Sequence, residues 1–152
     1  MDMSATESRQ RQKLFSKLYG EFWVEPDQLY DFPHGLIGLH ELKRFALVPF
    51  EASPFFLFHA IEEDWNFLTV PAGLIETCCY EFQLDEATAQ FLDVTSMQDV
   101  AVLLIVNWTE DRPFVNLKAP LLFNTVNRKG CQYIIQDRDY PIRHPLTFKE
   151  SA

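Results

Sequence analysis

The chain has 152 residues, of which 47% are hydrophobic and 14% aromatic, and its formal net charge is −9. This composition excludes a disordered chain, because disordered chains lack the apolar residues that build a core. The longest apolar run, residues 100–106, is far shorter than the roughly 18 residues of a membrane-spanning helix. The polar first dozen residues do not resemble an export signal. We therefore expect a cytoplasmic protein with a flexible arm at residues 1–12 and one domain at residues 13–152.

Short apolar segments follow the arm, each broken by Pro, Gly or acidic residues. Apolar segments of this length are typical of strands, and Pro and Gly between them are typical of turns. In the first half of the chain, strands or extended segments are expected at residues 18–24, 29–32, 45–50, 55–61 and 67–70. Turns are expected at residues 33–35 and at the acidic residues Glu62, Glu63 and Asp64.

One helix is expected at residues 86–93. Asp85 can cap this helix, because an Asp side chain accepts hydrogen bonds from the first backbone N–H groups of a helix. Ala87, Phe91 and Leu92 would lie on one face of it.

The second half of the chain continues the β pattern. Residues 100–108 are the most apolar segment and predict a central strand. Further strands are expected at residues 114–117, 121–124 and 132–135, the last two joined by a hairpin connection at residues 127–130. Two prolines in residues 139–146 argue against regular structure there. The whole pattern predicts an all-β, mainly antiparallel, β-barrel-like single domain with one or two short helices.

Charge is unevenly distributed along the chain. Residues 45–111 contain twelve Asp and Glu and no Lys or Arg, whereas residues 112–152 contain seven basic and three acidic residues. An acidic surface favours basic protein partners, and direct nucleic-acid binding requires clustered Lys and Arg. We therefore expect protein partners and neither nucleic acid nor a membrane. The alternative is ordinary acid that keeps the protein soluble.

Motifs of catalysis and metal binding are missing from the sequence. None of the four histidines, at positions 34, 40, 59 and 144, lies three or four residues from another His or from a Cys, so no zinc site and no other cofactor is expected. Cys78, Cys79 and Cys131 are a poor disulfide framework and are interpreted as buried or half-buried thiols. A Cys–His nucleophile pair assembled by the fold stays open.

Several segments combine Pro or Gly with mixed functional groups, and rigid loops of this kind present a surface at low entropic cost. They are residues 31–38, 115–120, 128–130 and 139–146. For Phe32, Leu117 and Leu146 we prefer a role in sealing a barrel. For Arg143 and His144, contact with a partner and contact with an inner carboxylate are equally open.

Four motifs occur in order in these segments. They are Lys-Leu-Tyr-Gly-Glu at 17–21, Phe-Pro-His-Gly-Leu-Ile-Gly at 32–38, Val-Asn-Leu-Lys-Ala-Pro-Leu-Leu-Phe-Asn at 115–124 followed by Arg-Lys-Gly-Cys-Gln at 128–132, and Tyr-Pro-Ile-Arg-His-Pro-Leu at 140–146. In this order the chain resembles the FliW family of bacterial flagellar assembly factors. Residues 71–80 and the first dozen residues depart from the family pattern.

The resemblance implies a small β-barrel-like protein without enzymatic activity. Family members bind the carbon storage regulator CsrA, an RNA-binding translational repressor, and they also bind flagellin. Flagellin that accumulates in the cytoplasm takes up FliW and leaves CsrA free to repress flagellin translation, whereas flagellin export frees FliW and relieves the repression. The family also helps to protect flagellin before export.

Candidate partner-binding residues come from these motifs and from the acidic turn. They are Phe32, Pro33, Asn116, Asn124, Arg128, Tyr140, Arg143, His144, Glu62, Glu63 and Asp64. An RNA-binding partner carries cationic surface, and acid docked beside that surface opposes the approach of a phosphate backbone. We expect the acid of residues 45–111, including the acidic turn, to face CsrA or to lie beside its RNA path.

Two other functions stay open. One is a barrel that binds an apolar small molecule among Phe55, Phe56, Phe58 and Phe67, although a barrel of this size is usually filled by its own side chains. The other is an enzyme that uses one of the three cysteines. A monomer is expected, because nothing in the sequence resembles a dimerising helix.

Overall fold

The computed structural model describes residues 11–77, 79–109 and 111–150. Its strands are β1 (Gln12–Ser16), β2 (Gly20–Val24), β3 (Leu29–Asp31), β4 (Arg44–Pro49), β5 (Phe56–Ala60), β6 (Asn66–Pro71), β7 (Val100–Thr109), β8 (Arg112–Val115), β9 (Leu121–Asn124), β10 (Lys129–Gln132) and β11 (His144–Pro145). Its helices are α2 (Glu86–Leu92) and the 3₁₀ turns η1 (Pro26–Gln28), η2 (Ala72–Leu74) and η3 (Met97–Asp99). Within the described ranges, no helix is both long and apolar enough to cross a membrane.

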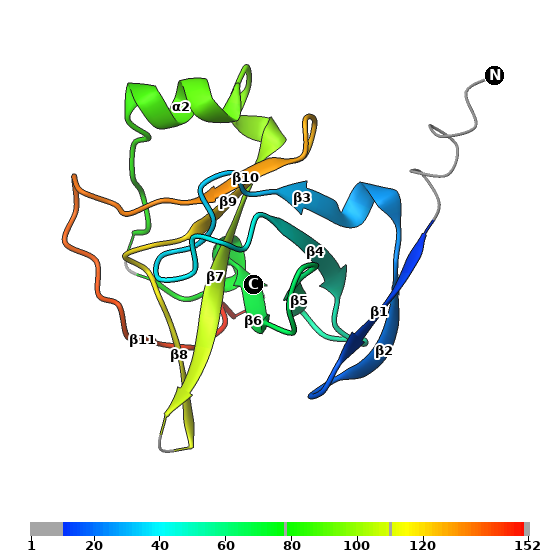
Figure 1. The fold of residues 1–152 in the computed structure, drawn as a ribbon. Coiled ribbons are helices and arrows are strands. Elements are labelled where there is room, and N and C mark those ends of the chain that lie inside the picture. The colour runs from blue at the N-terminus through cyan, green and yellow to red at the C-terminus, as the bar shows by residue number, and fades with distance from the viewer. Residues whose placement is uncertain (1–10, 78, 110, 151–152) are drawn as a thin grey trace.

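Seven strands close into a barrel (Figure 1). Their order is β7-β6-β5-β4-β3-β10-β9, and β9 pairs again with β7. Every pairing in this ring is antiparallel except the short one between β3 and β10, which joins Asp31 to Lys129. The mainly antiparallel, barrel-like fold expected from the sequence is therefore confirmed.

Strand β7 is the central strand that its apolar sequence predicts. On one side it pairs with β6, and on the other it pairs first with β9 and then, through residues 106–109, with β8. The end of β7 and β8 together leave the barrel as a protruding hairpin (Figure 1). Trp108, on this hairpin, is 62% exposed.

Phenylalanine rings fill the barrel interior. Phe32, Phe45, Phe58 and Phe123 are fully buried. The rings of Phe45 and Phe58 stack at 4.2 Å between centroids, and Phe32 lies 5.2–5.5 Å from each of the other three rings. Burial of each such ring stabilises the fold by about 1.5–3 kcal/mol.

A glycine in β10 makes room for this cluster. A Cβ atom on Gly130 would lie 2.3 Å from the ring of Phe32, which is far inside van der Waals contact. The Arg-Lys-Gly segment of the sequence therefore requires Gly at its third position because the core ring passes directly beside the strand.

The β1–β2 hairpin was only half predicted. The first strand was expected at residues 18–24, but residues 17–19 form a turn and β2 begins at Gly20, whose φ of +82° suits glycine. Strand β1 was missed, because its apolar residues Leu14 and Phe15 do not alternate. It begins at Gln12, the last residue of the expected arm, while residues 1–10 of that arm lie outside the described residues.

Two later predictions were displaced. The strand expected at residues 132–135 is β10 at Lys129–Gln132, because the hairpin turn occupies residues 125–128 and Arg128 takes a left-handed φ of +64°. The tail was expected to contain no regular element, but β11 pairs with β8. Pro145 fits there because an edge position needs no backbone N–H group.

The β1–β2 hairpin packs against the outer face of β4 and β5. Val24, Ala46 and Leu57 form the buried contact. His59 is also buried on this side, with the ring of Phe22 edge-on at 5.4 Å. Its Nδ1 atom makes no hydrogen bond to a described residue. Burial lowers the pKa of His59, and the nearby carboxylate of Asp64 opposes this shift in part.

Helix α2 covers the barrel over β9 and β10 (Figure 1). The Asp85 cap expected from the sequence is confirmed, because its side chain accepts a hydrogen bond of 2.7 Å from the backbone N–H of Thr88. Leu92 is fully buried against Leu122 and Cys131. The helix ends at Asp93, whose φ is +55°.

Candidate functional site

Two predicted partner-binding residues are internal. Phe32 lies in the barrel core, and Asn124 is 2% exposed. The Asn124 amide donates a hydrogen bond of 2.7 Å to the carbonyl of Leu92 and accepts one of 2.9 Å from the N–H of Val126. Neither side chain is presented at the surface: Phe32 fills the core, in agreement with the barrel-sealing role preferred for it, and Asn124 joins the end of α2 to the β9–β10 turn.

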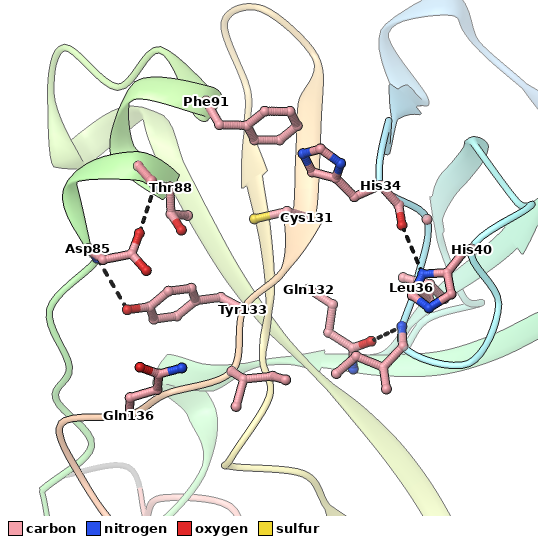
Figure 2. Close-up of a pocket in the computed structure, with 14 residues that line it drawn as sticks. His34, Leu36, His40, Asp85, Thr88, Phe91, Cys131, Gln132, Tyr133 and Gln136 are labelled. Carbon is pink, nitrogen blue, oxygen red and sulfur yellow. Dashed lines mark hydrogen bonds between the residues drawn. The ribbon is translucent and has the colours of Figure 1, made fainter.

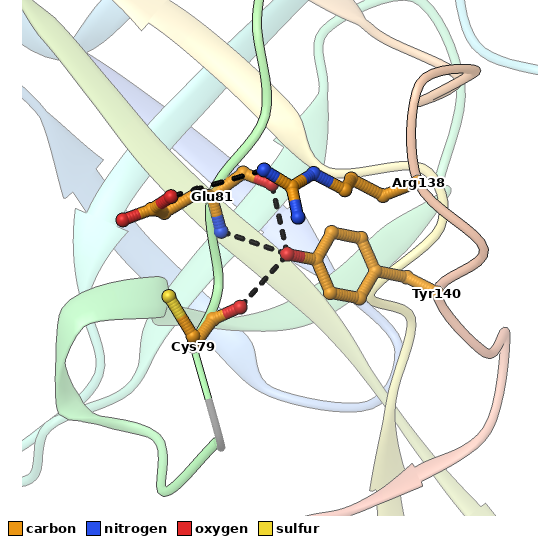
Figure 3. A network of polar contacts seen from close by, with 4 residues as sticks. All are labelled: Cys79, Glu81, Arg138 and Tyr140. Atoms are coloured by element: carbon orange, nitrogen blue, oxygen red, sulfur yellow. Dashed lines mark hydrogen bonds and ion pairs between the residues drawn. The ribbon is translucent and has the colours of Figure 1, made fainter.

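Asn116 and Tyr140 also hold the fold together. The Asn116 side chain accepts hydrogen bonds of 3.0 Å from the backbone N–H groups of Lys118 and Ala119 and shapes the β8–β9 connection. The Tyr140 hydroxyl accepts a hydrogen bond of 2.8 Å from the N–H of Glu81 (Figure 3). It also lies 2.9 Å and 2.8 Å from the carbonyl oxygens of Cys79 and Glu81, either of which its proton can reach.

Tyrosine hydroxyls fasten the whole segment from residue 79 to residue 85 to the barrel. Besides Tyr140, the Tyr80 hydroxyl donates to the carbonyl of Leu117 at 2.7 Å. Tyr133 donates to the carbonyl of Gln83 at 2.9 Å and accepts from the N–H of Asp85 at 3.2 Å. Burial raises the pKa of both Tyr80 and Tyr133, so these hydroxyls stay protonated donors. Sequence reasoning missed this role, since the bonded groups are backbone atoms far along the chain.

Pro33, Glu62 and Arg128 lie near one another although they are distant in sequence. The Pro33 carbonyl accepts a hydrogen bond of 3.1 Å from Lys43 Nζ, and the Glu62 carboxylate accepts bonds of 3.1 Å from the N–H groups of Lys43 and Arg44. The Arg128 carbonyl accepts from the N–H of Asp31 at 2.8 Å, one residue from Phe32. This region joins two of the sequence motifs to the acidic turn.

The acidic turn connects β5 to β6 and is exposed at all three positions. Asp64 accepts hydrogen bonds from the N–H of Lys17 at 3.1 Å and from the side chain of Asn66 at 3.3 Å. Glu62 and Asp64 thus hold neighbouring segments while their carboxylates still face solvent. The turn presents three negative charges at one place.

Arg143 and His144 make no contact with a carboxylate of a described residue. Arg143 donates to the Thr109 hydroxyl at 2.8 Å and lies 4.8 Å above the ring of Phe114. His144 Nε2 lies 3.0 Å from the carbonyl of Glu76. Among the described residues, Arg143 therefore turns toward the protruding β7–β8 hairpin and His144 toward a backbone carbonyl, and contact of either with a partner stays a prediction.

Apolar side chains lie beside Arg143. Trp108 and Ile142 are 62% and 65% exposed and line a shallow pocket of about 310 Å³ with Phe114. Trp108 was expected at the end of the central strand at residues 100–108. Its polar neighbours Asn107 and Thr109 were the available signal that β7 runs out of the barrel at this end.

A second pocket, of about 380 Å³, lies between α2, the loop at residues 33–40 and the end of β10 (Figure 2). At one end the ring of His34 packs against Phe91, with 4.5 Å between centroids. Ile37 and Ile134, 53% and 47% exposed, contribute apolar surface. The sequence marks residues 31–38 as a surface segment but gives no sign of a pocket there, because the pocket forms only where three distant segments meet.

Cys131 lines the same pocket, but its setting does not suit a nucleophile. Burial raises the pKa of the Cys131 thiol to about 12, whereas the reactive form of cysteine is the thiolate. Within the described ranges, no three His, Cys, Asp or Glu side chains come together in a group that could hold a metal ion. Cys78 lies outside the described residues.

The barrel interior does not suit a small-molecule site either. Phe58 is fully buried in the ring cluster, and Phe56 and Phe67 pack against that cluster. Phe55 lies in a different apolar cluster, with Val70 and Ile75. A small barrel filled by its own side chains, with exposed acidic and apolar surfaces, defines a protein-binding module.

Comparison with known proteins identifies the family of this module. Residues 13–146 match the family model described as FliW protein, and the chain therefore belongs to the FliW family. A flagellar assembly factor FliW from Caldicellulosiruptor bescii is 36% identical over 140 residues, which cover 90% of this chain and 91% of that protein. The protein of the same name from Bacillus subtilis (strain 168) is 32% identical over 136 residues, which cover 88% of this chain and 95% of that protein.

A solved structure agrees with this assignment. The crystal structure of the flagellar assembly factor FliW superimposes with a TM-score of 0.79 at 28% identity, over 90% of this chain and 97% of that chain. The protein is thus a flagellar assembly factor, in a family of regulatory proteins. The resemblance noted from four sequence motifs is confirmed.

Proposed function

We propose that this flagellar assembly factor acts in the cytoplasm by binding CsrA and flagellin alternately. Bound to CsrA, it antagonises repression of flagellin translation. Bound to accumulated flagellin, it releases CsrA and protects flagellin until export. The proposal rests on membership of the FliW family together with the acidic surface described below.

One observation carries the CsrA part of the proposal: the exposed acidic turn of Glu62, Glu63 and Asp64. It stands in a stretch of sequence that contains no Lys or Arg from residue 45 to residue 111. A fixed cluster of carboxylates beside a cationic RNA-binding surface attracts that surface and repels phosphate. From the sequence, these three residues are expected to face CsrA or to lie beside its RNA path, and we propose the same role for them here.

The test is an RNA competition experiment with CsrA and flagellin from the same cell. CsrA holds a labelled RNA, and the full chain is titrated in at several salt concentrations. The test variant is E62Q/E63Q/D64N, which removes three charges while it keeps the oxygen atoms that accept backbone hydrogen bonds. The matched control, E86Q/D93N/D99N, removes three charges from the region of α2 and η3.

We expect the test variant to need about tenfold more protein to release the RNA, with the difference shrinking at high salt because exposed charges are screened. The control variant should behave as the unmodified chain. Identical competition curves for both variants would remove the acidic turn from the proposal. Titration of the unmodified chain against CsrA and against flagellin tests whether either protein is a partner. Absence of binding to both at about 50 µM would overturn the proposed function.

A further inference from the structure

Strand pairing continues beyond the end of β10 on one side only. The N–H groups of Tyr133 and Ile135 donate hydrogen bonds of 3.0 Å and 2.9 Å to the carbonyls of Pro120 and Lys118. The chain after β10 therefore stays extended, with Tyr133 and Ile135 bonded to the segment before β9, although β10 itself ends at Gln132. It prolongs the barrel wall past the point where β3 leaves it, since β3 contacts β10 only through Asp31 and Lys129.

The other edge of this segment is open. Because N–H groups alternate in direction along an extended strand, those of Ile134 and Gln136 point away from Pro120 and Lys118. Neither N–H group donates a hydrogen bond to another described residue. Such a row of unpaired backbone groups is a template for one more strand.

The two residues of this edge, Ile134 and Gln136, line the pocket of Figure 2. Helix α2 forms one wall, and the loop at residues 33–40 forms the other. The loop is held in place by a hydrogen bond of 3.0 Å from the N–H of Ile37 to the side chain of Gln132. The exposed side chains of Ile37 and Ile134 lie in the pocket, where alternate apolar residues of an added strand can pack.

Charge at the pocket selects among extended peptides. Among the described residues that line the pocket there is no Lys or Arg, and the carboxylate is that of Asp85. Hydrogen bonds from Thr88 lower the pKa of Asp85, which keeps this carboxylate ionised. Asp85 lies at the end of the slot where Tyr133 stands, because its backbone N–H donates a hydrogen bond of 3.2 Å to the Tyr133 hydroxyl.

We infer that this slot, between α2 and the loop at residues 33–40, binds an extended peptide segment of a protein partner as an added β-strand. The peptide pairs with the open edge at Ile134 and Gln136 through its backbone. Its apolar side chains contact Ile37 and Ile134, and it carries a Lys or Arg beside Asp85. The inference goes beyond the proposed function, since it does not depend on which protein supplies the segment.

The test uses a random library of peptides of about ten residues, selected against the immobilised full chain. The most enriched peptide is then synthesised in two forms, one with its basic residue and one with uncharged norleucine in that place. Affinities are measured by fluorescence anisotropy for the unmodified chain and for D85N. Asparagine is a good helix cap, so D85N removes the charge without removing the cap. D93N, at the other end of α2, is the matched control.

We expect enriched sequences that alternate apolar residues and contain Lys or Arg. D85N should weaken the basic peptide about fivefold and leave the norleucine peptide unchanged, whereas D93N should change neither, because the coupling is local. I134P, which removes the N–H donor, should weaken both peptides at least about tenfold, and I134A should weaken them less. Thermal unfolding shows whether each variant is folded.

Other results overturn the inference. They are the absence of any enriched peptide, or enriched peptides that bind D85N and I134A as tightly as the unmodified chain. These two variants suffice if I134P does not fold. The titration with CsrA and flagellin is independent of this selection, so the proposed function stands or falls separately.

Discussion

The barrel interior and the layer that covers it are held together by different forces. Inside the barrel, four buried phenylalanine rings contact one another, so that the stabilisation is shared among several ring pairs. In the covering layer, residues 79–93, the segment before α2 is fastened by individual hydrogen bonds from tyrosine hydroxyls, and the end of α2 is fastened by Asn124.

This difference explains where a binding slot can form. Packed rings exclude an opening, because the whole cluster shares the cost of any displacement. A layer that is joined to the barrel by one apolar cluster and by individual hydrogen bonds can open locally at a lower free-energy cost than the barrel interior. The slot beside β10 lies where the two regions meet, with a rigid strand on one side and α2 on the other.

The largest expected effect comes from the barrel interior. Phe32→Ala should lower the free energy of unfolding by about 3–5 kcal/mol, because it empties a site enclosed by three other rings. Chemical denaturation followed by fluorescence measures this change. Phe15→Ala, at a 61% exposed position, should cost less than about 0.5 kcal/mol. Equal losses in the two variants would contradict the assigned core.

Next in size is the joint between the barrel and α2. Asn124→Ala leaves the N–H groups of the β9–β10 turn without their acceptor and should cost about 1–3 kcal/mol. Asn127 still donates to the carbonyl of Leu92, so α2 should loosen without detaching. Hydrogen exchange should speed up in α2 and in residues 125–128 but not in β4 and β5. Asn107→Ala, on the exposed end of β7, is the control.

A smaller effect is expected at Tyr140. Tyr140→Phe keeps the ring against Tyr80 but removes the hydroxyl that bonds the backbone of Glu81, at a cost of about 0.5–1.5 kcal/mol. Hydrogen exchange should accelerate at Glu81 while the barrel strands keep their protection. If the barrel strands lost protection to the same degree, the covering layer would not be a separate unit. Tyr19→Phe is a suitable control, since the Tyr19 hydroxyl makes no hydrogen bond to a described residue.

The smallest effect concerns pH and the packing of the β1–β2 hairpin. Burial lowers the pKa of His59 in the folded chain, so the unfolded chain binds the proton more tightly. The contribution to stability is complete above the unfolded pKa of about 6.5 and is lost as the pH falls through and below it. Comparison of the unmodified chain with His59→Phe at pH 7.5 and 5.5 isolates this term. A difference that stays constant between the two pH values would show that His59 does not titrate as described.

Much of this architecture could be predicted from local patterns. The strand segments, the position of α2 and its Asp85 cap follow from side-chain periodicity and turn chemistry, which act over a few residues. The filled interior was also expected, because a small closed barrel is usually filled by its own side chains. The sequence alone also determined the uneven distribution of acid.

Tertiary structure decided which side chains of the motifs reach the surface. Phe32 and Asn124 belong to motifs that suggested contacts, yet one fills the core and the other binds α2 across 32 positions of sequence. The tyrosine bonds to residues 79–85 and the open edge at Ile134 depend on strands brought together by barrel closure. Local patterns cannot contain this information, because the hydrogen-bond partner of a backbone group often lies far away in the sequence.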